Sequence, residues 1–307
     1  MNKKRILFLY MAYPFTLAHY FRHALEKRPD VELVTCGAYT GDWIPWGNGM
    51  TLPAKYVKQV DLPLPRTVTL PSWGVIERKI GNEFDLVLNI DAGFHLNDKP
   101  DGIPYAVVGT DPHVFNDNGW YDAVRTKADY FFNMQRYYMR DGDIHLPYAC
   151  SPDHHYAMSN VEKRYDASLI GLHYESRTKL VSALRHRGMS VFYDIGQIWD
   201  EYRQTNNEST VGLNWSSLMD INARTFEMMA MMQVPVINRL PHLDELGLIE
   251  GQHYLGFDSV QEGVEKTEWA LAHPNQAHAI ALSAHNLVHE KHTYELRVQQ
   301  ILETVGL

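Results

Sequence analysis

The chain has 307 residues, 45% of them apolar, and a formal net charge of −9. This length allows two domains with a core in each, and the negative charge argues against a protein whose main role is to coat nucleic acid, because such binding needs clustered Lys and Arg. No apolar run approaches the roughly eighteen residues of a membrane span. The two cysteines, Cys36 and Cys150, suggest neither a disulfide framework nor a metal site, so we expect a cytoplasmic location.

The N-terminal segment begins like a parallel sheet. The apolar run from Arg5 to Tyr10 is bounded by charges and predicts a strand buried in a parallel sheet. The run is too short to be the apolar core of a signal peptide. A helix over 16–27 and a strand over 31–35 follow. The turn after the first strand lacks G-x-G-x-x-G, so the dinucleotide-binding fingerprint is absent. Its aromatic and proline residues, Tyr13 among them, suit an acceptor better than a phosphate.

Residues 37–72 are rich in Gly, Pro and Trp, and we expect them to form long loops without regular structure. Loops of such length in a compact domain are usually functional, although a variable surface insertion is the alternative. Trp43 and Trp46 offer flat aromatic faces on which a sugar ring or a base could stack. Together with Tyr13 they are candidate acceptor-binding residues.

A carboxylate and an imidazole follow one of the next predicted strands. A helix over 73–80 precedes strands over 86–90 and 105–108, and the second of these strands runs into Gly109-Thr110-Asp111-Pro112-His113. The carboxyl ends of parallel strands are where open α/β sheets hold ligands, so Asp111 and His113 are candidate catalytic residues. The alternative is a purely structural turn, since Asp-Pro is a common turn starter.

The segment Ser151 to His155 (SPDHH) contains three adjacent side chains that could bind a metal: Asp153, His154 and His155. Neighbouring ligands on one short loop rarely complete a tetrahedral site, and no second cluster follows. We therefore interpret this segment as a linker between domains and expect no metal there.

A second alternation of strands and helices starts near Tyr165 and predicts a second parallel sheet. We expect strands over 167–171, 190–193 and 209–214, helices over 176–187 and 197–203, and terminal helices over 261–272, 275–290 and 294–304. Gly171 ends a strand just before the helix that carries Arg177, which indicates a turn that could face a phosphate. Arg177 could equally be a solvated helix residue.

The stretch from Asn222 to Asn238 predicts a buried helix, a turn at Pro235 and a short strand at 236–237. Arg224 and Glu227 share one face of its first turns. Unpaired backbone N–H groups and the positive end of the helix dipole favour an anion at that position. The alternative is a surface ion pair worth a few tenths of a kcal/mol.

These segments resemble the GT-B glycosyltransferases, especially the group typified by the spore maturation protein CgeB. That group carries R-x-F-E-A-x-A-x-G-x-x-[LV], P-x-L-x-E-L and H-T-Y-x-x-R blocks, which read RTFEMMAMMQVPV (224–236), PHLDEL (241–246) and HTYELR (292–297) here. Its D-x-H matches Asp111 to His113, and its L-P-x-A-x-x-P-x-x-H matches LPYACSPDHH (146–155). One departure is Met231-Met232-Gln233, which removes the glycine turn after the helix.

The resemblance implies an α/β chain of the GT-B type, with two Rossmann-like domains whose parallel sheets face each other across a cleft. We expect an acceptor-binding domain over 1–155, a donor-binding domain over 156–290, and a C-terminal helix, 291–307, that packs back on the first domain. The implied activity is transfer of a sugar from a nucleotide sugar, expected to be a UDP-sugar, to a hydroxyl group. The acceptor would be an envelope glycan or a hydroxymethylated base in phage DNA, and the net charge mildly disfavours the latter.

The resemblance also assigns roles to residues. The candidate donor-binding residues are Gly171, Arg177, Asn214, Asn222, Arg224 and Glu227, where the arginines would offset diphosphate charge and Glu227 would accept hydrogen bonds from the ribose. Asp111 and His113 could contact the sugar or act as base, with His19 as the rival base. No D-x-D follows a strand, so we expect no metal and no cofactor besides the nucleotide sugar as co-substrate. The glutamate of retaining relatives would fall at Met219, which leaves the stereochemistry open.

Two other classes of function stay open at this point. A non-catalytic nucleotide-sugar or glycan-binding protein would tolerate loss of Asp111 and His113 without losing donor affinity. A sugar-nucleotide epimerase of the same fold would turn over the donor in the absence of an acceptor.

Overall fold

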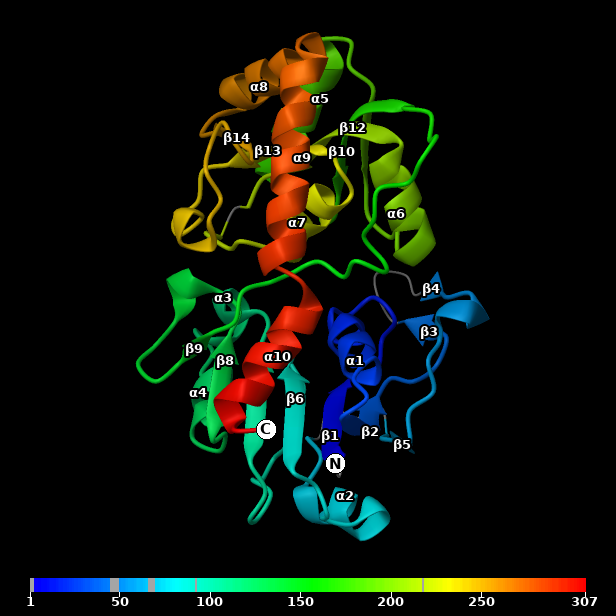
Figure 1. Ribbon diagram of the computed structural model, residues 1–307, viewed down its shortest axis with the longest axis vertical. Coiled ribbons are helices and arrows are strands. Elements are labelled where there is room, and N and C mark those ends of the chain that lie inside the picture. Colours follow the sequence, from blue (N-terminus) through cyan, green and yellow to red (C-terminus); the bar gives the residue numbers. More distant parts are fainter. Residues whose placement is uncertain (1–2, 45–49, 66–69, 92, 217) are drawn as a thin grey trace. The chain divides into compact units, whose positions relative to one another are not determined.

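The computed structural model describes residues 3–44, 50–65, 70–91, 93–216 and 218–307 (Figure 1). The chain forms two compact units. Unit 1 contains Met1–Pro147 and Tyr294–Leu307, and unit 2 contains Tyr148–Thr293. The C-terminal helix α10 (Tyr294–Val305) is therefore part of unit 1. In the described part of the chain, no helix is both long enough and apolar enough to cross a membrane.

Unit 1 is built on a parallel sheet of seven strands in the order β5-β2-β1-β6-β7-β8-β9. These strands are β1 (Lys4–Met11), β2 (Val31–Ala38), β5 (Leu62–Pro63), β6 (Leu86–Asp91), β7 (Tyr105–Gly109), β8 (Tyr130–Asn133) and β9 (Ile144–His145). Its helices are α1 (Ala18–Glu26), α2 (Trp73–Ile80), α3 (Pro112–Phe115), α4 (Trp120–Arg125) and α10, with short 3-10 turns at Ala54–Tyr56 and Arg136–Tyr138.

The core of unit 1 follows from the apolar run predicted at its start. Ile6 to Tyr10 are completely buried because β1 has a strand on each side, as a parallel sheet requires. Helix α10 packs on α1, where the ring of Tyr294 lies 5.3 Å from that of Tyr20 and 5.0 Å from that of Phe21. This contact fixes the last helix of the chain to the first.

The expectation of structureless loops over 37–72 is wrong in part. The described residues of this stretch contain the hairpin of β3 (Trp43–Ile44) and β4 (Met50–Thr51), a 3-10 turn and the edge strand β5. The β5 segment is held by Asp61, whose carboxylate accepts hydrogen bonds from the backbone N–H and the hydroxyl of Thr35 at 2.8 and 2.7 Å. Strands of two residues are too short to show a hydrophobic period.

Unit 2 is built on a second parallel sheet, in the order β11-β10-β12-β13-β14. Its strands are β10 (Tyr165–Ile170), β11 (Val191–Asp194), β12 (Ser209–Asn214), β13 (Val234–Asn238) and β14 (Leu255–Phe257). Its helices are α5 (Glu175–His186), α6 (Trp199–Asn207), α7 (Ala223–Ala230), α8 (Val260–Ala272) and α9 (Pro274–Lys291), with a 3-10 turn at Asp244–Leu246. The chain leaves β10 for β11 on one side and returns to β12 on the other.

The turn between α7 and β13 differs from its prediction. Helix α7 ends at Ala230, and Met232 takes the left-handed conformation with φ 61°. Met232 falls at the glycine of the R-x-F-E-A-x-A-x-G motif that the sequence resembles, so the left-handed turn is present here without a glycine. Pro235 lies inside β13, opposite Gly212. It is tolerated because pairing with β14 begins only at Val236.

Candidate functional site

The sheet of unit 2 reverses its strand order between β10 and β12, and this is where open α/β sheets bind ligands. Gly171 directly follows β10, and Asn214 is the last residue of β12. Helix α5 follows the first of these strands and α7 follows the second, so both helices begin at the same edge of the sheet. Five of the six predicted donor-binding residues meet at this edge, namely Gly171, Arg177, Asn214, Asn222 and Arg224.

Gly171 lies directly beneath two arginines. Its φ is 151°, a backbone conformation that residues with a side chain rarely adopt. A Cβ at this position would overlap Nη2 of Arg224 and would lie 3.6 Å from Nη1 of Arg177. Glycine is therefore required both by the backbone and by the close approach of the Arg224 guanidinium.

Arg224 is held by backbone and amide oxygens. Its Nε donates to the carbonyl of Ile170 at 2.8 Å, and its Nη1 donates to Oδ1 of Asn214 at 2.7 Å. The same Oδ1 accepts from Nδ2 of Asn222 at 3.1 Å, and Nδ2 of Asn214 reaches the hydroxyl of Thr225 at 3.3 Å. The two asparagines therefore orient the guanidinium but do not neutralise its charge.

Arg177 is held in the same way. Its Nε donates to the carbonyl of Trp215 at 2.8 Å, and its Nη1 donates to that of Leu172 at 3.0 Å. The residue is 5% exposed, so the alternative of a solvated helix residue is wrong. Burial, and next the charge of Arg224, lower the pKa of Arg177 to about 10. Within the described ranges neither arginine forms an ion pair with a carboxylate, and the nearest acidic influence on Arg177 is the longer-range charge of Asp220.

Glu227 lies one turn further along α7 and is 8% exposed. Its Oε2 accepts a hydrogen bond of 2.6 Å from the hydroxyl of Tyr202, and its Oε1 lies 3.7 Å from Nε2 of His155. Burial raises the pKa of Glu227 to about 6, while the Tyr202 hydrogen bond and the charge of Arg224 act in the opposite direction. The alternative of a surface ion pair between Arg224 and Glu227 is therefore wrong, because the carboxylate is buried and bonds elsewhere.

The SPDHH segment belongs to unit 2 and folds as a turn, so its interpretation as a linker is wrong. The backbone N–H of His155 donates to the carbonyl of Ser151 at 2.7 Å, and the N–H of Ser151 donates to Nδ1 of the His155 ring at 3.1 Å. Nδ1 therefore accepts, and the ring proton is on Nε2, which faces Glu227. Burial lowers the pKa of His155 to about 3, so the ring is neutral.

The predicted catalytic residues of unit 1 have separate neighbours. Asp111 is the N-cap residue of α3, and its Oδ2 accepts from the hydroxyl of Thr110 at 2.9 Å. The backbone carbonyl of Asp111 accepts from Val114 and Phe115. Asp111 and Pro112 thus do start a turn of helix, in line with the structural alternative, and they also stand at the carboxyl end of β7.

His113 is half-buried on the short helix α3. Its ring lies 6.1 Å from that of Tyr138, and its Nδ1 is buried with no hydrogen-bond partner in the described part of the chain. A buried ring nitrogen without a partner is rare and costs free energy. Such an atom is available to a hydroxyl group of a bound molecule.

His19, the rival base, lies in the core of unit 1, and its role as a base stays a prediction. It is completely buried on α1, where its ring packs edge-on against Tyr10 at 5.5 Å, and burial lowers its pKa to about 4. Tyr13 is 8% exposed and stacks on Tyr39 and Phe15, at 4.7 and 5.3 Å between ring centres. The side chain of Trp43 and the whole of Trp46 lie outside the described residues, so both stay predictions.

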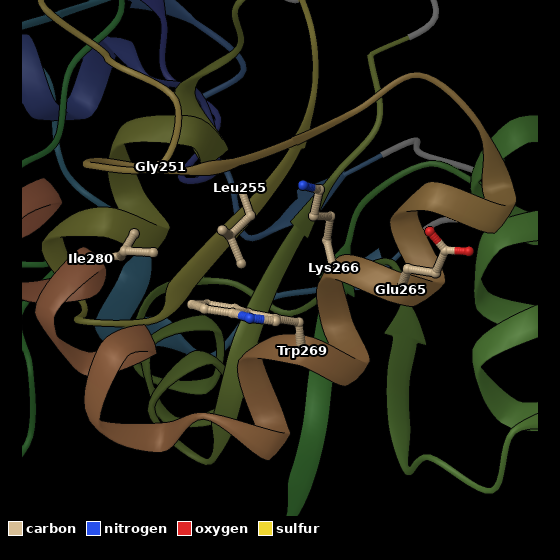
Figure 2. A pocket seen from close by; sticks show the side chains of 6 residues that line it. All are labelled: Gly251, Leu255, Glu265, Lys266, Trp269 and Ile280. Atoms are coloured by element: carbon tan, nitrogen blue, oxygen red, sulfur yellow. The ribbon is translucent and has the colours of Figure 1, made fainter.

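A hollow of about 410 Å³ lies elsewhere in unit 2 (Figure 2). The figure shows Trp269, Leu255 and Ile280 around it, with Glu265 and Lys266 nearby on α8. The ring of His273 stacks on Trp269 at 4.9 Å, which covers one face of the indole. The hollow contains none of the predicted donor-binding residues, and its two charges are opposite, so we do not assign it to an anionic donor.

No group of three or more His, Cys, Asp or Glu side chains that could hold a metal ion occurs within the described ranges. The metal candidate from the sequence was Asp153 with His154 and His155, but both histidines use Nδ1 in other contacts. Nδ1 of His154 lies 2.8 Å from the hydroxyl of Ser151, and Nδ1 of His155 accepts a backbone N–H.

Sequence reasoning did not find Tyr202 and assigned no role to His155. The hydroxyl of Tyr202 reaches Glu227 from a different helix, 25 residues away, so no local spacing could indicate the contact. His155 closes the motif LPYACSPDHH, and its place at the end of that motif was the signal that could have been used.

Comparison with known families gives one match. A family model described as glycosyl transferase-like matches residues 159–303, which is nearly the whole of unit 2 together with part of α10. No curated protein matches the chain significantly by sequence. The matched region is slightly less than half of the chain, and the match identifies unit 2 as glycosyl transferase-like.

Several solved structures are similar over almost the entire chain. A sucrose-phosphate synthase from Thermosynechococcus elongatus has a TM-score of 0.68 at 11% identity and covers 98% of both chains. An alpha-glucosyltransferase in complex with UDP and a 13-mer DNA has 0.69 at 12%, covering 99% of this chain and 100% of that one. Anabaena HepE in complex with UDP has 0.65 at 11%, covering 98% and 99%. At this identity the likeness establishes the fold, and the expected GT-B class is confirmed.

Proposed function

We propose that this chain, a glycosyltransferase with the GT-B fold, moves a sugar from a UDP-sugar to a hydroxyl acceptor and holds the donor in unit 2. The observation that carries the proposal is the pair Arg177 and Arg224 over Gly171. Two guanidinium groups with no carboxylate partner are costly to bury unless an anion joins them. A diphosphate supplies that anion, and the start of α7 adds the positive end of a helix dipole.

The two arginines have a chemical role in this scheme. When the bond between sugar and diphosphate breaks, negative charge develops on the departing phosphate oxygens. Positive groups fixed in advance at that position stabilise the transition state more than the bound donor. The asparagine and carbonyl contacts of Arg224 hold it in place, so it need not reorganise during the step.

Glu227 would hold the ribose. An ionised carboxylate is an acceptor with about four lone-pair positions, and the Tyr202 hydroxyl occupies one of them. The others can accept the ribose hydroxyls, as an acidic residue does in dinucleotide-binding folds. UDP as the nucleotide is supported by the similar fold of HepE and of the alpha-glucosyltransferase, both solved in complex with UDP.

Unit 1 would bind the acceptor. Asp111 and His113 at the end of β7 are the proposed catalytic residues, and Tyr13, Trp43 and Trp46 are the proposed acceptor contacts. The acceptor would be a glycan of the cell envelope or a hydroxymethylated base in phage DNA, and the chain would be a CgeB-like enzyme of the cytoplasm. One structural neighbour is an alpha-glucosyltransferase solved with DNA, which supports the second acceptor at the level of the fold.

Calorimetric titration tests the donor site. UDP should bind the wild type, and Arg224→Ala should weaken that binding by roughly 1.5–3 kcal/mol, the scale of hydrogen bonds to charged groups. Arg185→Ala is the matched control, because Arg185 lies in the last turn of the same unit's α5 and also donates to a backbone carbonyl, that of Val191. Equal affinities for the three proteins would refute the site.

Turnover separates an enzyme from a binding protein. Labelled UDP-glucose should lose its sugar to water or to an added acceptor, and we propose that this reaction needs no metal because the arginines offset the diphosphate charge. Activity should therefore survive excess EDTA. Activity that disappears in EDTA and returns with magnesium or manganese would instead indicate a metal-bridged diphosphate.

A further inference from the structure

The contact between α6 and α7 places a tyrosine hydroxyl on the candidate ribose-binding carboxylate. The hydroxyl of Tyr202 donates to Oε2 of Glu227 at 2.6 Å, a length typical of a bond to an ionised oxygen. Glu227 is mostly buried, so few water molecules can reach the carboxylate in place of this donor. A buried carboxylate depends on such contacts to remain charged.

The other side of the carboxylate faces a neutral ring. His155 presents its protonated Nε2 at 3.7 Å from Oε1 of Glu227, because its Nδ1 accepts the N–H of Ser151. The ring does not add a positive charge, since burial holds the pKa of His155 far below neutral. Glu227 therefore lies between one uncharged hydrogen-bond donor, the Tyr202 hydroxyl, and an uncharged ring that is beyond hydrogen-bond distance.

The two nearby arginines do not bond to the Glu227 carboxylate. On α7, Arg224 acts on Glu227 through its charge but bonds to Ile170 and Asn214. On α6, Arg203 donates to the carbonyl of His154 at 3.2 Å and pairs with Asp200 at 2.7 Å. Neither arginine bonds to the carboxylate, so the Tyr202 hydroxyl is the strongest contact of Glu227 in the described structure.

We propose that Tyr202 is a positioning residue, which keeps the Glu227 carboxylate ionised and turned so that its remaining lone pairs accept the ribose hydroxyls of the donor. This inference rests on the proposed function. The bond fixes rotation of the carboxylate about its last side-chain torsion, and it offsets part of the burial penalty on the charged form. Tyr202 itself need not touch the donor.

The pH dependence of donor binding tests this role. UDP-glucose is the probe, because its diphosphate has no proton to lose near neutral pH, and its affinity is measured by calorimetry from pH 5 to 9. In the wild type, affinity should fall as the pH drops through about 6, where Glu227 takes up a proton. In Tyr202→Phe the same fall should occur about one pH unit higher, because the carboxylate loses a stabilising donor.

Two further variants complete the test. Tyr254→Phe is the control, because Tyr254 is another tyrosine of unit 2 but lies near Glu250 and Arg239 instead. Its profile should coincide with that of the wild type. Glu227→Gln should bind UDP-glucose more weakly at pH 8 and should show no transition near pH 6, because its amide does not titrate.

The outcomes separate the inference from the proposed function. If Tyr202→Phe lowers affinity by one constant factor at every pH, or leaves it unchanged, Tyr202 is structural and the inference fails, while weak binding by Glu227→Gln keeps the donor site. If Glu227→Gln binds like the wild type, the proposed ribose contact itself fails. The phenylalanine ring keeps its place opposite His155, at 6.1 Å between ring centres, so Tyr202→Phe should fold.

Discussion

The ligand edges of the two sheets differ in how completely they are formed. In unit 2, Gly171, Arg177, Asn214 and Arg224 touch one another or share partners, and their charges lack carboxylate partners in the part of the chain that is described. In unit 1, Asp111 and His113 stand two residues apart, but each has its own neighbours. A site for a constant group such as a diphosphate can be preformed, whereas hydrogen bonds at a catalytic site often tighten only when the substrate binds, which is what we expect if Asp111 and His113 are catalytic.

The largest effect on activity is expected at the ligand edge of unit 1. His113→Ala should lower kcat by about 10²–10⁴-fold if His113 transfers a proton, while nucleotide affinity stays nearly intact. Steady-state kinetics and calorimetry at matched folded fraction provide both values. If the Asp111-Pro112-His113 segment is only a turn, the variant loses some stability and no rate beyond it.

At the ligand edge of unit 2, the close packing of Gly171 and Arg224 should make the effects of their substitutions on UDP affinity depend on each other. Gly171→Ala should weaken UDP binding because its Cβ overlaps Nη2 of Arg224. Removing the guanidinium relieves that overlap, so Gly171→Ala should cost less affinity in an Arg224→Ala background, with a coupling of about 0.5–3 kcal/mol. Additive losses in the double-mutant cycle would mean that the two residues do not meet in solution.

The burial of Glu227 has a consequence for stability. Its pKa is raised to about 6 in the folded protein from an ordinary value of 4.5, so folding favours the protonated form. The extra stability is present below pH 4.5 and is lost as the pH rises through about 6. Relative to Glu227→Gln, the wild type should lose about 2 kcal/mol of unfolding free energy across this window.

Denaturant titrations of the two proteins at several pH values would measure this difference. Glu290→Gln is the control, because the side chain of Glu290 is 72% exposed. A wild type whose stability relative to Glu227→Gln stays constant from pH 4.5 to 7 would show that Glu227 is solvated.

The smallest effect concerns the turn after α7. Met232 has φ 61°, which costs a residue with a side chain about 1 kcal/mol or more, so Met232→Gly should raise stability by roughly 0.5 kcal/mol after the entropy of glycine is subtracted. Met231→Gly is the control, because Met231 has φ −89° and is buried, and it should lose stability. Thermal unfolding that ranks Met232→Gly below the wild type would indicate that packing of the methionine outweighs the strain.

The sequence predicted those features that depend on local pattern. Strand 209–214 and helix 73–80 have the predicted bounds, because long apolar periods are read directly from the chain. The meeting of Gly171, Arg177 and Arg224 was foreseeable, because parallel strands bring their carboxyl ends to one edge. The resemblance to known motifs supplied the roles that the spacing alone left undecided.

The remaining features depend on tertiary contacts. The three residues of β14 are too few to show a period, and Pro235 fits in β13 only because of where the next strand begins. The bond between Tyr202 and Glu227 joins two helices without any sequence spacing that would reveal it. His19 has a side chain that could act as a base, but it lies in the core. Only the packing of α1 in the structure shows this burial.

The central claim is that Glu227 holds the ribose of a uridine nucleotide beside the two arginines. The most direct test compares UDP with its 2′-deoxy analogue on the wild type and on Glu227→Ala by calorimetry. The wild type should bind UDP more tightly than the analogue, and Glu227→Ala should bind both nucleotides equally, with UDP weakened by roughly 1.5–3 kcal/mol. If both proteins distinguish the two nucleotides by the same amount, Glu227 does not contact the ribose 2′-hydroxyl and the claim is contradicted.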